Sequence, residues 1–206
     1  MKFLLLAILL ASTAFAEPRL FYSKLFPGSK PEWVGVSIER DGKVEYRETK
    51  DEEPMKFQLN KVDCDKIFEL AGKLDFFTRK LESGLPVAKM GEKSYTWEDG
   101  AKKTEVSFNY STDLDAQALQ DFMERIVETE QLMINLERTA RFDRLGVNQA
   151  LLQLQIFWDR KRLITPTQFL KMLDRVVKND VYLNMARDRA AQLATLIRAA
   201  ETAEAK

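Results

Sequence analysis

The chain has 206 residues, of which 45% are hydrophobic and 31% charged, and its formal net charge is zero. This composition is typical of a folded globular protein and excludes a largely disordered one. Histidine is absent and Cys64 is the only cysteine. Ser-His-Asp and Cys-His catalytic sites are therefore excluded, as is an intramolecular disulfide, and the commonest zinc ligand is missing.

The first sixteen residues predict a signal peptide. Lys2 gives a short basic start, residues 3–11 form an unbroken apolar run, and the Ala-Phe-Ala of residues 14–16 offers small side chains for cleavage before Glu17. The run is too short to cross a bilayer core of about 30 Å as a helix. No cysteine lies near the cleavage point, so no lipid anchor is expected. We expect an exported protein, periplasmic or extracellular, and the alternative is a retained N-terminal anchor.

Residues 17–111 are predicted to form an α+β domain. Alternating apolar and polar side chains predict two hairpins, each with an Asp-Gly turn, at residues 41–42 and 99–100. Between the hairpins, Asp63 is the expected N-cap of a helix whose apolar side chains recur every three or four positions as far as Phe77. The strand-like segments are Leu20–Phe26, Trp33–Glu39, Lys43–Thr49, Met55–Leu59, Lys93–Glu98 and Thr104–Tyr110.

Residues 112–206 are predicted to be all-helical and bundle-like. Thr112 is the expected cap of a long helix, and Thr165-Pro166 predicts a later helix start. An apolar seam follows the long helix at spacings of three and four, and we expect the last helix, with Leu193, to cover it. The predicted fold is thus α+β: a small antiparallel sheet of two hairpins around one helix, followed by a helical half. The seam comprises Leu119, Phe122, Ile126, Thr129, Met133, Leu136 and Ala140.

Charge is unevenly distributed between the two halves. Residues 17–137 contain 18 Lys or Arg against 25 Asp or Glu, whereas residues 138–198 contain 12 against 5. One interpretation is a basic helical surface for a polyanion, an anionic membrane face or an acidic partner. The other is that the halves dock on each other, or pair in an oligomer, and neutralise each other locally. The basic residues are scattered over several helices, which favours docking.

One loop carries the only candidate binding residues. Lys89 and Lys93 flank Gly91 between the first helix and the second hairpin, where two ammonium groups and a free backbone amide would suit an anion or a partner. The alternative is a plain connector in which Gly91 allows an unusual backbone angle. No calcium-loop pattern is present, so no metal, cofactor or catalytic residue is predicted.

Two further side chains have competing interpretations. Cys64 is either a small buried filler, an intermolecular disulfide partner or a reactive thiol at a helix start. Trp158 precedes the charged run of residues 159–162, which suits either a membrane-surface contact or a core tryptophan beside a solvated helix end. In both cases we favour the structural interpretation.

Three short segments resemble an uncharacterised family of exported bacterial proteins of unknown function. They are the loop 87–93, the strand end Phe108-Asn109-Tyr110 and the run 141–146. The two-hairpin layout around one helix is also similar to small domains found in exported proteins. The resemblance implies export and brings no activity, ligand or catalytic residue with it.

The sequence therefore predicts an exported, soluble, non-enzymatic binding or assembly module that acts through protein contacts, with a protein partner or a second copy of itself. Nucleic acid is not an expected partner outside the cell, and the mature chain has no predicted transmembrane segment. The alternative is a hydrolase that uses paired carboxylates without metal or histidine, because Asp and Glu are then the abundant acid-base groups.

Overall fold

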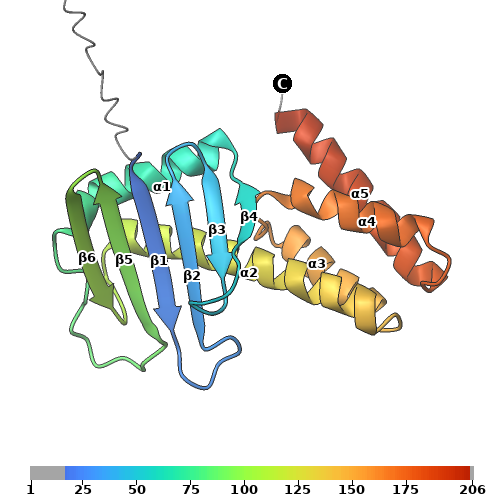
Figure 1. The fold of residues 1–206 in the computed structure, drawn as a ribbon, viewed down its shortest axis with the longest axis horizontal. Helices are drawn as coiled ribbons and strands as arrows, with labels where there is room; N and C mark the ends of the chain where they lie inside the picture. Colours follow the sequence, from blue (N-terminus) through green and yellow to red (C-terminus); the bar gives the residue numbers. More distant parts are fainter. Residues whose placement is uncertain (1–16, 205–206) are drawn as a thin grey trace, which may run out of the picture.

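The computed structural model describes residues 17–204, in which a six-stranded antiparallel sheet is combined with five α-helices (Figure 1). The predicted α+β class is confirmed, while the predicted signal peptide, residues 1–16, lies outside the described residues. The strands are β1 (Arg19–Leu25), β2 (Trp33–Glu39), β3 (Lys43–Arg47), β4 (Met55–Gln58), β5 (Glu92–Asp99) and β6 (Lys102–Phe108). The helices are α1 (Lys61–Lys73), α2 (Leu114–Phe142), α3 (Val147–Asp159), α4 (Leu170–Lys178) and α5 (Asn184–Glu204), with short 3-10 turns at Asp75–Phe77 and Pro166–Phe169.

The six strands form one sheet in the order β4-β3-β2-β1-β5-β6. The two predicted hairpins are β2–β3 and β5–β6, and β1 joins them because it pairs antiparallel with both β2 and β5. Leu20 of β1, for example, lies opposite Ile38 on one side and Trp97 on the other. The first strand of the chain is therefore central.

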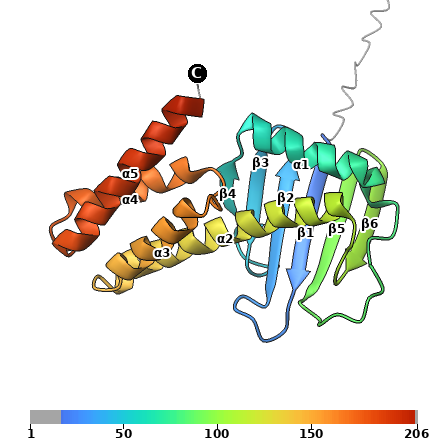
Figure 2. The same ribbon diagram turned by 180° about the vertical axis from the view of Figure 1, so that it is seen from behind.

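Helices α1 and α2 cover one face of this sheet, as Figure 2 shows from behind. Period-two alternation puts Leu20, Tyr22, Val36 and Tyr95 on that face, where all four are fully buried. The opposite face carries small polar side chains such as Ser37 and Thr96, and no helix of residues 17–204 lies on it (Figure 1). The main core consequently lies between the sheet and the two helices.

Helix α2 belongs to two cores. Its first half contributes Leu119, Met123 and Ile126 to the sheet core, and its second half contributes Met133 and Leu136 to a separate core among the helices. The apolar seam is thus covered within the chain. Beyond the sheet, α2, α3, α4 and α5 form an arm that projects sideways (Figure 1).

The last helix is not the direct cover of the seam, contrary to expectation. Helix α3 packs along α2, and α5 packs on α3 and α4. Leu136 and Leu193 are nevertheless each only 1% exposed, because both belong to the helical core. The arm is therefore a layered packing rather than a pair of long helices.

Two of the expected helix caps are displaced by three residues and by one residue, and a third, Thr165 before Pro166, is in place without a side-chain bond. The N-cap of α1 is Asn60, whose Oδ1 accepts the backbone N–H of Asp63 at 2.8 Å. The N-cap of α2 is Asp113 rather than Thr112, and it accepts the N–H groups of residues 115 and 116. Thr165 has a left-handed backbone (φ 46°) and makes no capping bond with its side chain. Asn60 and Asp63 are both residue types that cap helices, as are Thr112 and Asp113, and only the backbone geometry chooses between them.

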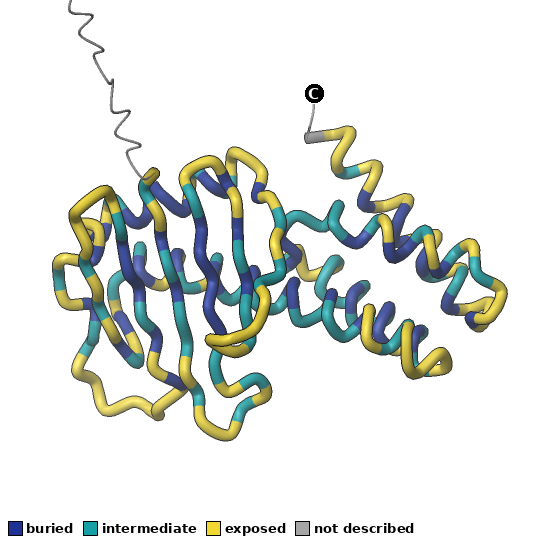
Figure 3. Tube along the Cα trace, viewed as in Figure 1, coloured by how far each residue is buried: buried dark blue, intermediate teal, exposed yellow. Residues whose placement is uncertain are grey.

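Docking of the two halves neutralises little of the charge asymmetry. Arg162 pairs with Asp121 at 2.8 Å and with Glu128 at 2.6 Å, both on α2. Among the described residues it is the only cation of residues 138–198 that pairs with an acid outside that segment. Most of the positive charge of residues 138–198 is therefore not neutralised by the acidic half. Figure 3 shows that the helices of the arm carry both buried and exposed residues along their length.

Candidate functional site

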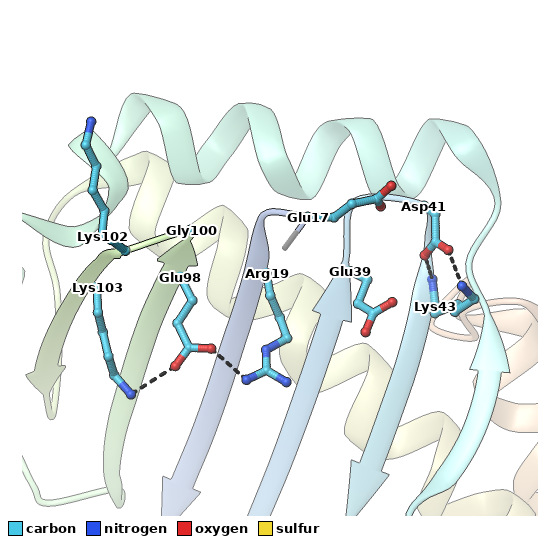
Figure 4. Close-up of a pocket in the computed structure, with 10 residues that line it drawn as sticks. Glu17, Arg19, Glu39, Asp41, Lys43, Glu98, Gly100, Lys102 and Lys103 are labelled. Atoms are coloured by element: carbon cyan, nitrogen blue, oxygen red, sulfur yellow. Dashed lines mark hydrogen bonds and ion pairs between the residues drawn. The ribbon is translucent and has the colours of Figure 1, made fainter. Parts of the chain in front are cut away.

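One hollow lies at the end of the sheet where β1 begins and β5 ends, with a volume of about 710 Å³ (Figure 4). Glu98 pairs with Arg19 at 2.6 Å and with Lys103 at 2.9 Å, and Asp41 pairs with Lys43 at 2.6 Å. Hydrogen bonds from Lys103 and then Arg19 lower the pKa of Glu98, and those from Lys43 lower the pKa of Asp41.

These ion pairs do not suit the chemistry of a carboxylate hydrolase. Such an enzyme needs one protonated carboxylic acid beside one ionised carboxylate. Glu98 and Asp41 are both stabilised in the ionised form, so neither is a proton donor near neutral pH. Both carboxylates are already paired with lysine or arginine side chains of the same chain. The hollow is also open to solvent.

A second site lies at the opposite end of the sheet, where β1 ends and β5 begins. We call it the lysine cleft and define it by Lys24, Phe26, Lys93, Asn109 and Glu124. Its hollow has a volume of about 550 Å³ between α2, the end of β1 and the loop that precedes β5. Exposed apolar side chains form its rim: Val87, Met90 and Tyr110.

Two lysines face each other in this cleft. Lys24 and Lys93 are directly opposite on β1 and β5, on the face that α2 covers. Like charges in this position destabilise a sheet. Lys93 is only 3% exposed, and its ammonium donates to the backbone carbonyl of Asn109 at 2.7 Å. Burial, followed by the positive charge of Lys24, lowers the pKa of Lys93.

One carboxylate reaches the cleft from α2. Glu124 lies 3.7 Å from the ammonium of Lys24 and accepts a hydrogen bond from Gln120 at 3.0 Å. Among the described residues, Lys93 has no carboxylate partner at ion-pair distance. The cleft thus presents two ammonium groups to a single lining carboxylate. The buried ammonium of Lys93 contacts the carbonyl of Asn109 and lies 5.9 Å from the centre of the Phe108 ring. It feels the charge of Glu124 and Glu82 only from a distance.

A smaller hollow of about 230 Å³ continues the cleft between α2 and the β1–β2 loop. The two hollows share Lys24, Phe26 and Glu124. Tyr22 lines the smaller one, and its hydroxyl is buried without a hydrogen-bond partner among the protein groups. Burial, with the charge of Glu124, raises the pKa of Tyr22, so this hydroxyl remains a donor.

The loop above the cleft is fastened to the end of β6. Glu82 accepts the backbone N–H of Asn109 at 2.6 Å, and that hydrogen bond is the main cause of its lowered pKa. The Asn109 side chain accepts from the N–H of Met90 at 2.9 Å and donates to the carbonyl of Ala88 at 3.1 Å. These bonds fix the rim of the cleft.

The sequence-predicted site residues lie in two places. Lys93 is in the lysine cleft, whereas Lys89 and Gly91 line another hollow beside Glu82 and Phe108. Gly91 has φ +94°, and a side chain there would approach the Cβ of Phe26 to 3.0 Å, so glycine is needed for the backbone. Lys24, Glu124 and Tyr22 were missed, because strand pairing and helix packing bring them to Lys93.

The remaining candidates have structural surroundings. Cys64 is 3% exposed, its Sγ lies 3.5 Å from the carbonyl of Arg40, and burial raises its pKa. This agrees with the buried-filler interpretation. Trp158 is half-buried against the helical core. Within residues 17–204, no cluster of three or more potential metal ligands occurs, and no helix is both long and apolar enough to cross a bilayer.

No protein-family model matches the chain, and no curated protein matches its sequence.

Proposed function

We propose that this chain is an exported, non-enzymatic binding protein, and that the lysine cleft holds its ligand. The observation that carries this proposal is the buried ammonium of Lys93, which faces a second lysine and has no carboxylate at ion-pair distance within residues 17–204. Burying a cation without a counter-charge is costly, and an anionic group supplied by a ligand would relieve that cost.

The lining indicates the class of ligand. Small-molecule sites are mostly apolar hollows of roughly 300–1,000 Å³ with a few convergent polar groups, and the cleft fits that description. Lys24 and Lys93 suit a carboxylate or phosphate, while Phe26, Met90 and Tyr110 suit an apolar body. We infer a small ligand, or a chain end, with an anionic head and a short apolar tail.

The apolar seam of α2 does not support binding of a protein partner. Its apolar side chains are buried in the two cores, so they are not offered to a partner or to a second copy. The hydrolase alternative gains no support from Glu98 and Asp41, since both are stabilised in their ionised form. Ligand binding by the lysine cleft is the form of the binding hypothesis that the geometry favours.

The K93M variant tests the cleft. Calorimetric titration with hexanoate and hexyl phosphate is expected to show binding to the unmodified protein, weakened about ten- to hundredfold in K93M because a charged hydrogen-bond donor is lost. Methionine fills similar space without a buried charge, so the melting temperature of K93M should stay equal or rise.

The matched control is K89M, which removes an exposed lysine from the neighbouring loop and should bind both probes normally. Hexanol, which has the same tail without the charge, should not bind. Equal binding by K93M and the unmodified protein would refute the role of the lysine cleft.

At alkaline pH, we also expect Lys93 to take up a proton when an anion binds. Burial lowers the pKa of Lys93 in the free protein, and a bound anion would raise it again. The affinity for hexanoate should therefore fall as the pH rises through the lowered pKa of Lys93. Calorimetry in buffers of different ionisation enthalpy measures the proton uptake, and a pH-independent affinity would contradict this account.

Export is tested separately. Cell fractionation followed by N-terminal sequencing should find the protein outside the cytoplasm with Glu17 as its first residue, because the small side chains of residues 14–16 suit cleavage there. A protein that stays in the cytoplasm and begins at Met1 would refute export without affecting the lysine cleft.

A further inference from the structure

The free end of the helical arm exposes an unusual number of large apolar side chains. They come from two helix connections: the last residue of α2 with the loop that follows it, and the loop between α4 and α5 with the first turn of α5. Isolated exposed apolar side chains are ordinary, but a contiguous group marks an interaction site. We call this group the apolar tip; its members, with their exposed fractions, are Phe142 (77%), Leu145 (74%), Val181 (48%), Leu183 (43%) and Met185 (58%).

The two loops lie side by side at the end of the arm farthest from the sheet, in both Figure 1 and Figure 2. The hydroxyl of Tyr182 donates to the carbonyl of Ala140 at 3.1 Å and so ties the second loop to the end of α2. Tyr182, Val147 and Ala186, which are next to or within these segments, are buried in the helical core. The side chains of the apolar tip therefore stand on a packed base and are not needed to complete it.

Cations outnumber acids in the two segments that carry the apolar tip. Residues 138–147 and 175–188 contain six cations and three acids, and none of the six makes an ion pair among the described residues. The guanidinium of Arg141 lies 5.8 Å from the centre of the Phe142 ring. The six cations are Arg138, Arg141, Arg144, Arg175, Lys178 and Arg187, and the acids are Asp143, Asp180 and Asp188.

This charge decides which occupant fits. A second copy docked through the same patch would bring the net-positive segments of both copies together, and like charges across an interface oppose association. An anionic bilayer surface attracts such segments and accepts apolar side chains at the level of its headgroups. The two loops also form the projecting end of the arm (Figure 1), which suits insertion into a fluid surface.

We propose that the apolar tip docks the protein on an anionic lipid surface, with Phe142 and Leu145 inserted among the headgroups and Arg141 and Arg144 paired with lipid phosphates. This proposal is independent of the lysine cleft, which lies against the sheet at the other end of α2.

Vesicle flotation of the full chain tests the proposal. The protein should float with vesicles of equimolar phosphatidylcholine and phosphatidylglycerol and not with pure phosphatidylcholine. The double variants F142S/L145S and R141Q/R144Q should each weaken binding by about tenfold or more, since each removes two apolar or two charge contacts.

Two control variants test whether lipid binding depends on the apolar tip or on exposed apolar and basic side chains anywhere on the molecule. V62S/L114S removes two apolar side chains that are 78% and 79% exposed on the sheet side of the molecule. K50Q/K80Q removes two exposed lysines there. Both controls should bind vesicles like the unmodified protein, and circular dichroism should show every variant folded.

Three outcomes would overturn the proposal. They are no flotation of the unmodified protein, equal flotation with both kinds of vesicle, and equal losses in tip and control variants. The apolar run of residues 3–11, if retained, would bind both kinds of vesicle, and so it would give the second outcome. A dimer that F142S/L145S abolishes, without flotation, would assign the tip to a second copy instead.

Discussion

The E130Q variant is expected to keep its stability as the pH rises from 4.5 to 7, whereas the unmodified protein loses about 3 kcal/mol over this range. Glu130 lies on α2 between the two cores, is 1% exposed and accepts a hydrogen bond from Gln168 at 2.9 Å. Burial raises its pKa to about 7, with a smaller contribution from Glu137.

The direction of the pH effect follows from proton binding. Between pH 4.5 and about 7 the folded protein holds the Glu130 proton while the unfolded chain releases it, so stability falls as the pH rises. The paired acids, such as Glu98, have lowered pKa values and lose their contribution at more acidic pH. The two effects therefore occupy different pH windows.

Urea unfolding over a series of pH values measures this effect. The control is E201Q, which changes an exposed carboxylate on α5 and should leave the pH profile unaltered. If E130Q and the unmodified protein lost stability in parallel, Glu130 would be ionised in the folded state and our account of its burial would be wrong.

The second large effect is a loss of stability when a phenylalanine is removed from either the sheet core or the helical core. F77A and F169A are each expected to lower the free energy of unfolding by about 3–5 kcal/mol, because each leaves a cavity in a packed core. Phe77 is 2% exposed in the sheet core and stacks on Tyr95, with 5.0 Å between the centres of the two rings. Phe169 is fully buried in the helical core.

Because α2 contributes to both cores, we expect each variant to unfold in one transition. A W158F background leaves Trp33 and Trp97, both in the sheet, as the fluorescent reporters, while far-ultraviolet circular dichroism follows mainly the helices. The two signals should coincide for F77A and for F169A. An early loss of helix signal in F169A with unchanged fluorescence would show that the arm unfolds independently.

Local sequence patterns predicted which segments form helices and strands better than they predicted the residues at which the helices begin. Strand β2 matches the predicted Trp33–Glu39, because strict alternation and the Asp-Gly turn define it. Neither Asn60 nor Asp113 could be preferred over its polar neighbours as a cap, since the choice depends on backbone angles. The pairing of β1 with β5 joins segments about seventy residues apart, and no local pattern contains it.

The candidate site was predicted only in part. Lys93 precedes Tyr95 and Trp97 by two and four positions, so period-two alternation already placed it on the buried face of a strand. The sequence predicts a strand at Lys93–Glu98 and also offers Lys93 as a loop residue beside Gly91, and the alternation favours the buried face of the strand. Lys24 and Glu124 are a hundred residues apart and meet only because α2 returns across the sheet.

Helix α2 has a mechanical consequence as well. Its 29 residues make a rod about 43 Å long, with one end embedded beneath the sheet and the other carrying the apolar tip. Each degree by which the embedded end pivots displaces the far end by about 0.8 Å. Glu124, in the embedded half of α2, also lines the lysine cleft. A change in the angle between α2 and the sheet would therefore change the width of this cleft.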